Sequence, residues 1–183
     1  MIRVIAGEAK GRRLKVPKGM KVRPTADRVK EALFNILAPE IPGAVFLDLF
    51  AGSGGIGIEA LSRGAEKVLF VEQDPRHLRI LRENLTACGF EDRARVIPGD
   101  ARALLRKKAF PPCDFVFLDP PYDLPDPGEL LISVGKNVTV KNFIVYEHPR
   151  RREIPGELEG LIRTRTADYG EIRLSFFEIR NRE

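Results

Sequence analysis

The sequence is poor in the residues that build metal centres and disulfide scaffolds: its 183 residues include two cysteines, two histidines and no tryptophan. Cys88 and Cys113 lack the C-x-x-C spacing of a zinc site, and two cysteines cannot form a disulfide framework. His77 and His148 lie far apart in the sequence, which argues against a histidine-rich metal centre. We therefore expect no bound metal.

Long hydrophobic runs are also missing. No stretch approaches 18 uninterrupted apolar residues, and residues 1–4 include no apolar region of a signal peptide. We therefore expect a cytoplasmic protein without membrane contact. The length fits one domain over residues 1–183, in which residues 1–24 form a basic arm and residues 25–183 form an α/β core. The small size and the lack of an apolar surface stripe favour a monomer.

Positive charge is concentrated near the N-terminus. Residues 1–31 hold ten lysines and arginines against three acidic residues, a net charge of +7, whereas the whole chain carries +5. Lysine and arginine displace counterions from phosphates, so this segment favours a nucleic-acid partner, with a lysine-rich solvated surface as the alternative. The expected RNA contacts are Arg3, Lys10, Arg12, Arg13, Arg23 and Arg28. The run Arg150–Arg152 is either a second phosphate contact or an exposed loop.

The spacing of apolar residues predicts a mixed α/β fold. Residues 3–6 and 12–16 alternate apolar and charged side chains, which indicates a β-hairpin in the arm. One expected helix begins at Thr25, and the others cover residues 54–63, 75–88, 101–107 and 126–135. The expected strands cover residues 45–50, 68–71, 95–97, 115–118, 143–146, 161–166 and 172–179. Apolar strands that alternate with helices indicate a doubly wound, mostly parallel sheet, and the last two strands indicate an antiparallel C-terminal hairpin.

A glycine-rich loop follows the first buried strand. Gly52, Gly54 and Gly57 match the G-x-G-x-x-G pattern of a dinucleotide site, and Glu72 lies 20 residues after Gly52, where an acid accepts hydrogen bonds from ribose hydroxyls. This pattern alone fits either a nicotinamide cofactor or S-adenosylmethionine, and tight packing without a ligand is the third possibility. Asp48 favours S-adenosylmethionine, because a carboxylate inside a buried strand needs a cationic partner and the ammonium group of a methionine is one.

Gly99, Asp100 and Ala101 follow the third strand of the core. Ligands of doubly wound sheets bind beyond the carboxyl ends of the strands, so Asp100 can reach the adenine ring of a bound cofactor. Aspartate is also a common N-terminal cap of a helix, which is the structural alternative for this residue.

The most specific motif is the tetrapeptide Asp119-Pro120-Pro121-Tyr122, at the end of the fourth strand. The exocyclic amine of a nucleobase is a poor nucleophile, because its lone pair is delocalised into the ring. Hydrogen bonds from that amine to the Asp119 carboxylate and the Pro120 carbonyl would favour a pyramidal nitrogen with an exposed lone pair. The prolines fix the backbone, and Tyr122 can stack on the base. A rigid turn without catalytic function is the alternative.

These motifs resemble, in their order, the class I S-adenosylmethionine-dependent amino-methyltransferases. Arg3–Gly7, Gly11–Leu14, Arg23–Val29 and Phe34–Asn35 further resemble the N-terminal arm of the RsmD-type bacterial 16S ribosomal RNA guanine-N2 methyltransferases, and Tyr169–Gly170 with Leu174–Phe177 resembles their closing hairpin. The resemblance covers nearly the whole chain. One departure is local: Ala9 stands where we expect a bulkier residue.

The resemblance implies a seven-stranded sheet, S-adenosylmethionine as the methyl donor and a guanine of 16S ribosomal RNA as the acceptor. It assigns the cofactor pocket to Asp48, Gly52, Ser53, Gly54, Glu72, Gln73, Asp100 and Ala101, and the target amine to Asp119, Pro120, Pro121 and Tyr122. Arg28 could reach either RNA or the cofactor carboxylate. The substrate could be naked RNA or an assembling 30S particle.

Three other functions stay open. The same chemistry could act on adenine N6, cytosine N4 or a glutamine side chain, although DNA enzymes usually carry a larger recognition domain than the segment of about 40 residues that precedes the first strand of the sheet. The chain could also be a non-catalytic RNA-binding module with a vestigial pocket, a function that has no need of an intact Asp119–Tyr122 motif. A nicotinamide oxidoreductase is the most distant alternative.

Overall fold

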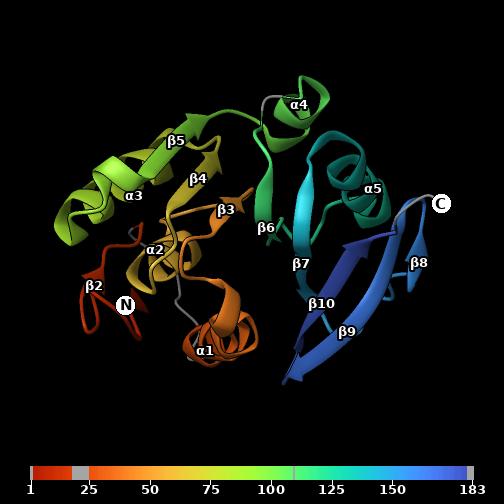
Figure 1. Cartoon of the computed structure of the whole chain (residues 1–183), viewed down its shortest axis with the longest axis horizontal. Coiled ribbons are helices and arrows are strands. Elements are labelled where there is room, and N and C mark those ends of the chain that lie inside the picture. The colour runs from red at the N-terminus through yellow and green to blue at the C-terminus, as the bar shows by residue number, and fades with distance from the viewer. Residues whose placement is uncertain (1, 18–24, 109, 181–183) are drawn as a thin grey trace.

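The structure is a computed structural model that describes residues 2–17, 25–108 and 110–180. Its centre is an eight-stranded sheet in the order β5-β4-β3-β6-β7-β10-β9-β8 (Figure 1). The strands are β3 (Val45–Asp48), β4 (Lys67–Glu72), β5 (Ala94–Pro98), β6 (Cys113–Leu118), β7 (Val140–Pro149), β8 (Glu157–Leu158), β9 (Leu161–Tyr169) and β10 (Ile172–Ile179). Strands β3 to β7 pair in parallel, whereas β7, β10, β9 and β8 pair antiparallel. The doubly wound sheet and the C-terminal hairpin are thus confirmed.

The expected count of seven strands was one too low. The additional strand, β8, has two residues and pairs with β9 at the edge of the sheet. It was missed because two residues are too short to show a period-two pattern. Strand β7 also continues to Pro149, beyond the expected end at residue 146, because residues 147–149 pair with Ile172–Leu174 of β10.

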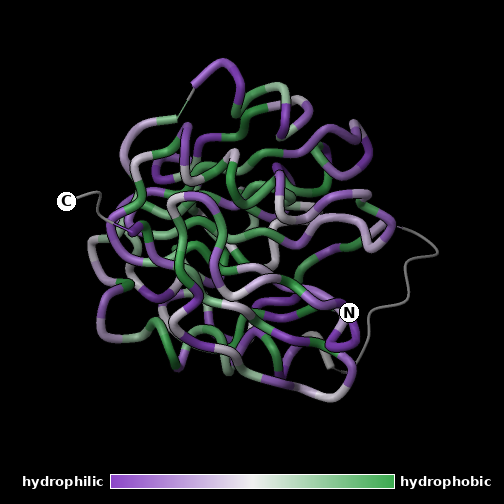
Figure 2. Tube along the Cα trace, turned by 90° about the vertical axis from the view of Figure 1, so that its right-hand side faces the viewer, coloured by the Kyte–Doolittle hydropathy of each residue, from purple (hydrophilic) through white to green (hydrophobic). Residues whose placement is uncertain are grey.

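Helices cover both faces of the sheet. Helices α1 (Thr25–Leu37), α2 (Gly55–Ser62) and α3 (Pro75–Cys88) share one hydrophobic core with the sheet, and α4 (Ala101–Arg106) and α5 (Pro127–Asn137) share the other. Two short 3₁₀ turns lie at Ala38–Glu40 and Glu91–Arg93. Figure 2 shows apolar positions concentrated inside the trace, in agreement with these two cores. None of the helices in the described ranges is long and apolar enough to cross a membrane.

The N-terminal arm forms a two-stranded antiparallel sheet of β1 (Ile2–Arg3) and β2 (Arg13–Leu14). These strands are shorter than expected because, beyond the hydrogen bonds between Val4 and residues 11–12, the arm bonds to the core. The backbone amides of Ile5 and Ala6 donate to the carboxylate of Glu59 in α2, at 2.8 and 3.1 Å. Ala9, the residue that departs from the family pattern, is buried, and its amide donates to Ser62 Oγ at 2.9 Å.

The chain reverses its direction of winding at β3. Strand β4 lies on one side of β3, and after β5 the chain crosses to β6 on the other side. In sheets of this type, ligands bind beyond the carboxyl ends of the strands where the winding reverses. The segments after β3 and β6 both lie there, and they carry the glycine loop and the Asp-Pro-Pro-Tyr motif.

Candidate active site

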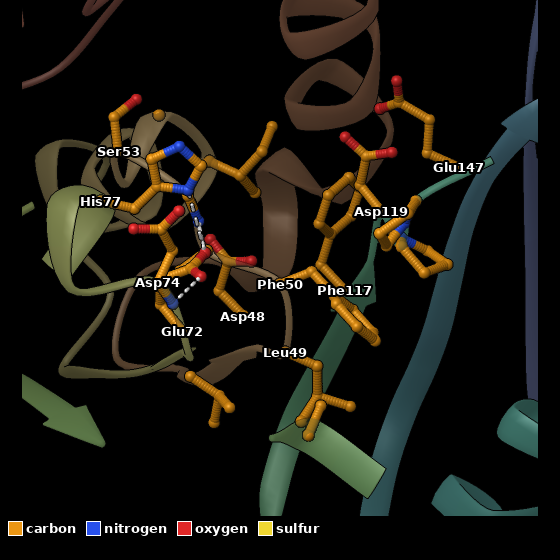
Figure 3. Close-up of a pocket in the computed structure, with 18 of the residues that line it drawn as sticks. Asp48, Leu49, Phe50, Ser53, Glu72, Asp74, His77, Phe117, Asp119 and Glu147 are labelled. Atoms are coloured by element: carbon orange, nitrogen blue, oxygen red, sulfur yellow. Dashed lines mark hydrogen bonds and ion pairs between the residues drawn. The ribbon is translucent and has the colours of Figure 1, made fainter. Parts of the chain in front are cut away.

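A cavity of about 650 Å³ lies at this reversal point (Figure 3), within the size range of small-molecule sites. Its lining includes seven of the eight residues predicted for the cofactor, namely Asp48, Gly52, Ser53, Glu72, Gln73, Asp100 and Ala101, and all four of the tetrapeptide, Asp119, Pro120, Pro121 and Tyr122. The fold therefore brings the two motifs, about 70 residues apart in the sequence, into one pocket.

Gly54 is the one predicted cofactor residue that does not line the cavity. It caps helix α2 with a φ of +90°, and a Cβ at this position would lie 2.4 Å from Leu81 Cδ1. Gly57, one turn into α2, lies so close to β4 that a Cβ would lie 2.2 Å from the Phe70 ring. These glycines shape the loop by allowing a left-handed turn and a close approach of helix to strand, as in dinucleotide-binding loops.

Asp48 ends β3 in the floor of the cavity and is almost fully buried. Its Oδ2 accepts a hydrogen bond of 3.2 Å from the Gly57 amide. Burial raises the pKa of this carboxyl to about 7; the negative charges of Asp119 and Glu72 add to the rise, and the Gly57 and Phe50 amides oppose it. A cationic ligand beside Asp48 would favour its ionised form.

Glu72 ends β4 and connects the glycine loop to the start of α3. Its Oε2 accepts from the Gly52 amide at 2.8 Å, and its Oε1 accepts from the Gln73 and Asp74 amides, both at 2.8 Å. The carboxylate is thereby fixed at the cavity wall, with His77 Nδ1 3.7 Å away. The predicted hydrogen bonds to a ribose would add to these backbone contacts.

Asp100 caps the N-terminus of a helix, which is the structural role that we considered as the alternative to ligand binding. Its Oδ1 accepts from the Ala103 amide at 2.8 Å, so it caps the N-terminus of α4. The residue also lines the cavity, beside Gly99 and Ala101. Capping fixes the orientation of the carboxyl group and is compatible with a contact to a ligand.

The Asp119–Tyr122 motif follows the end of β6 and lines the cavity. The Leu124 amide donates to the Pro121 carbonyl at 3.0 Å and closes the turn. Tyr122 is 44% exposed and is the one large hydrophobic side chain classed as exposed in the described ranges. An exposed aromatic ring beside a carboxylate offers a surface on which a base can stack.

Arg152 holds this turn from the loop after β7. Its guanidinium donates to the Tyr122 carbonyl at 2.9 Å and to the Leu124 carbonyl at 2.6 Å. We expected the run Arg150–Arg152 to be a phosphate contact or an exposed loop; it lies in a turn in which Arg150 and Arg151 are exposed and Arg152 is partly buried. Arg150 forms an ion pair with Asp168 at 3.2 Å.

The cavity lining also includes residues that the sequence analysis did not single out, among them Ile2 of the arm, Asp27 and Lys30 of α1, and Glu147 of β7. Lys30 is buried; its Nζ donates to the Arg3 carbonyl at 2.5 Å and lies 3.5 Å from Glu59. Burial lowers the pKa of Lys30, although Glu59 and Asp27 oppose this effect. Glu147 could have been found, because it is a charged residue directly after the predicted apolar strand of residues 143–146.

The predicted RNA contacts that the structure describes lie outside the cavity. Lys10, Arg12, Arg13 and Arg28 are exposed, as is Arg3, which lies 3.5 Å from Asp27, and none of these five described residues belongs to the cavity lining. For Arg28, the structure thus gives no support to a contact with the cofactor. Arg23 lies outside the described residues.

Comparison with known proteins identifies similar chains along nearly the whole length. The chain is 40% identical over 183 residues to "Putative rRNA methyltransferase YlbH" of Bacillus subtilis, covering 98% of this chain and all of that one. It is 45% identical over 148 residues to "Ribosomal RNA small subunit methyltransferase D" of Haemophilus influenzae, covering 79% of this chain and 77% of that one. The solved structure "Putative methyltransferase yhhF from Escherichia coli" superposes with a TM-score of 0.85 at 34% identity, over 99% of both chains.

A more distant structure shares the fold at 16% identity and a TM-score of 0.66, over 90% of this chain and 96% of that one: an RNA methyltransferase from Salinibacter ruber in complex with S-adenosyl-L-homocysteine. The family model described as "Conserved hypothetical protein 95" matches residues 2–178. The chain therefore belongs to this family, that of the RsmD-type methyltransferases.

Proposed function

We propose that this protein transfers the methyl group of S-adenosylmethionine to the exocyclic N2 amine of a guanine in 16S ribosomal RNA. The observation that carries the proposal is the cavity that Asp48 and Asp119 share: one carboxylate is suited to a cationic cofactor and the other to a target amine. Relatives of this chain are named as methyltransferases of small-subunit ribosomal RNA, which supports the substrate class.

The cavity fits the proposed cofactor in its charge. S-adenosylmethionine carries an ammonium group and a sulfonium, and Asp48, Glu72, Asp100 and Asp119 surround the space. We assign the ammonium group to Asp48, the ribose to Glu72 and the adenine to Asp100, with Gly52, Ser53, Gln73 and Ala101 as the remaining contacts. Gly54 shapes the loop. When bound, the cofactor supplies an electrophilic methyl group on sulfur.

The tetrapeptide holds the acceptor. The Asp119 carboxylate and the Pro120 carbonyl accept hydrogen bonds from the N2 amine, while Pro121 keeps the turn rigid and Tyr122 stacks on the base. The N2 lone pair then forms the new N–C bond, the electrons of the S–C bond remain on sulfur, and an N2 proton is released. No strong base is needed, because that proton becomes acidic as the bond forms. Orientation and fixed charges provide the acceleration.

The acceptor reaches this pocket only if it leaves the base stack, which requires a few kcal/mol. We assign the docking of RNA to the basic arm, through Arg3, Lys10, Arg12, Arg13, Arg23 and Arg28. We further propose that the chain is one catalytic domain over residues 1–183, acts as a monomer in the cytoplasm, and takes its RNA either naked or within an assembling 30S particle.

Mass spectrometry of digested 16S ribosomal RNA from a strain that lacks the gene tests this function. We expect one N2-methylguanosine to disappear, to return with the wild-type gene, and to stay absent with an Asp119→Ala gene. The purified Asp119→Ala protein should bind S-adenosylmethionine with nearly unchanged affinity. An intact N2-methylguanosine content would refute the proposal, and loss of a methylated adenine or cytosine instead would assign the activity to another base. Absence of S-adenosylmethionine binding to the wild-type protein would favour the non-catalytic alternative.

A further inference from the structure

Glu147 lies directly beside the tetrapeptide. In the parallel pairing of β6 with β7, Leu118 is the partner of Tyr146, so Asp119 and Glu147 are the next residues on adjacent chains. Backbones paired in this way lie about 5 Å apart, and both residues line the cavity. Figure 3 shows their carboxylates side by side, at the end of the cavity away from Glu72 and His77. The end of the pocket that is assigned to the target amine thus carries two acceptors.

Two neighbouring acceptors match one nucleobase better than the others. A carboxylate that has lost its proton can only accept hydrogen bonds. Guanine presents two donors side by side, the N2 amine and the N1–H. Adenine and cytosine present an amine beside a ring nitrogen that is itself an acceptor, N1 or N3, and that nitrogen would face a carboxylate without any hydrogen between them. A site built to pair with a donor rejects a base that lacks the donor, because a buried polar group is left unpaired.

We propose that Glu147 selects guanine by accepting the hydrogen bond of N1–H while Asp119 accepts from the N2 amine. This inference rests on the proposed function and adds the residue that distinguishes guanine from the other amino-bearing bases. It also gives Glu147 a role in the chemistry. When N2 forms its bond to the methyl carbon, positive charge develops on N2, and a fixed carboxylate at the neighbouring N1–H lies close enough to stabilise that charge.

The test uses 2-aminopurine, which keeps the N2 amine but has no hydrogen on N1. After the modified nucleotide has been mapped, small subunits are reconstituted with 16S ribosomal RNA that carries guanine or 2-aminopurine at that nucleotide. The wild-type enzyme should prefer guanine in kcat/KM by about 10- to 100-fold, the range for a hydrogen bond to a charged group. Glu147→Gln, whose amide can donate to the bare N1, should reduce that preference at least about tenfold, mainly through kcat on guanine.

Glu66→Gln is the matched control, because it removes one negative charge from an exposed position before β4, at the opposite end of the sheet. It should leave the preference unchanged. Glu147→Ala is the second variant and should also lose the preference. Equal use of the two bases by the wild-type enzyme, or an unchanged preference in a folded Glu147 variant, would overturn the inference. Failure of the wild-type enzyme to methylate the guanine particle would instead refute the proposed function.

Discussion

Asn84 Nδ2, on helix α3, donates a hydrogen bond of 2.9 Å to the carbonyl oxygen of Ser53 in the glycine loop. The same side chain bonds to Lys15 of the arm: its Nδ2 donates to the Lys15 carbonyl at 3.0 Å, and its Oδ1 accepts from the Lys15 amide at 2.8 Å. Asn84 is 1% exposed. One buried amide therefore joins the cofactor loop to the segment that we assign to RNA binding.

Replacement of Asn84 by alanine should disturb both segments at once. Three hydrogen bonds are lost, and the buried carbonyl of Ser53 and the partly buried backbone groups of Lys15 lose their partner, so we expect the free energy of unfolding to fall by about 1–3 kcal/mol. Cofactor affinity should fall as well, because the Ser53 loop is no longer held. Denaturant titration and calorimetry with S-adenosylmethionine measure the two effects. Thr86→Ala, at an exposed position of the same helix, is the control; a destabilised Asn84→Ala protein with wild-type cofactor affinity would limit Asn84 to a structural role.

Asp48 should make cofactor binding depend on pH. Burial raises the pKa of Asp48 in the folded protein without ligand to about 7, above the value in an unfolded chain. The protonated carboxyl therefore stabilises the folded state. This stabilisation is fully present below the pKa of the unfolded chain and is lost as the pH rises through 7. The ammonium group of the cofactor requires the ionised carboxylate. Affinity should therefore increase by up to about tenfold per pH unit until pH 7 and then level off.

Calorimetry with S-adenosylmethionine across this pH range checks the prediction, with Asp48→Asn as the comparison. The variant should bind more weakly and lose the dependence, and without ligand it should be more stable than the wild type at pH 8, since no buried carboxyl has to ionise. A wild-type affinity that stays constant between pH 5.5 and 7.5 contradicts the assignment of Asp48 to the ammonium group.

The elements and motifs that could be predicted from the sequence have local causes. Helix α3 was predicted with its exact bounds, because Pro75 follows the capping residue Asp74 and Gly89 ends the helix with a φ of +73°. Asp48 and Asp119 were expected in one cleft because Asp48 lies within an apolar strand that leads into the glycine loop, Asp119 follows another apolar strand, and the carboxyl ends of parallel strands meet at one edge.

The contacts that could not be predicted depend on residues far apart in the sequence. Glu59 reads as an ordinary helix residue, yet it is fully buried and accepts hydrogen bonds from Ile5 and Ala6, more than 50 positions away. Arg152 belongs to a run of three arginines and looks like its neighbour Arg151 in the sequence. The two differ only in the fold, where Arg152 bonds to the turn of the tetrapeptide. The spacing of residue types along the sequence does not predict hydrogen bonds between segments this far apart.

Arg152 should act on catalysis through the turn that it holds. Arg152→Ala removes two hydrogen bonds to the carbonyls of Tyr122 and Leu124, so the tetrapeptide is less well fixed against the target base. We expect kcat to fall by about 10- to 100-fold, the range for hydrogen bonds to a charged group, with little change in cofactor affinity. Methyl transfer to small-subunit particles measures kcat, and Arg151→Ala, at the exposed neighbouring position, should behave as wild type. Equal losses in both variants would indicate a contact with RNA instead.

The exposed arginines of the arm should set the salt dependence of RNA binding. Arg12 and Arg13 are exposed in the described arm and are assigned to phosphates, which release counterions when an arginine binds. Each replacement by glutamine should weaken binding of small-subunit particles and reduce the slope of log K against log salt by about 0.7–0.9. Binding titrations at several salt concentrations give the slope. Arg106→Gln, an exposed position on α4 at the other face of the sheet, should leave it unchanged. If the slope of the Arg12→Gln, Arg13→Gln double variant equals that of the wild type, the arm makes no phosphate contact through these side chains, and the net charge of the N-terminal segment has to be explained as solvated surface.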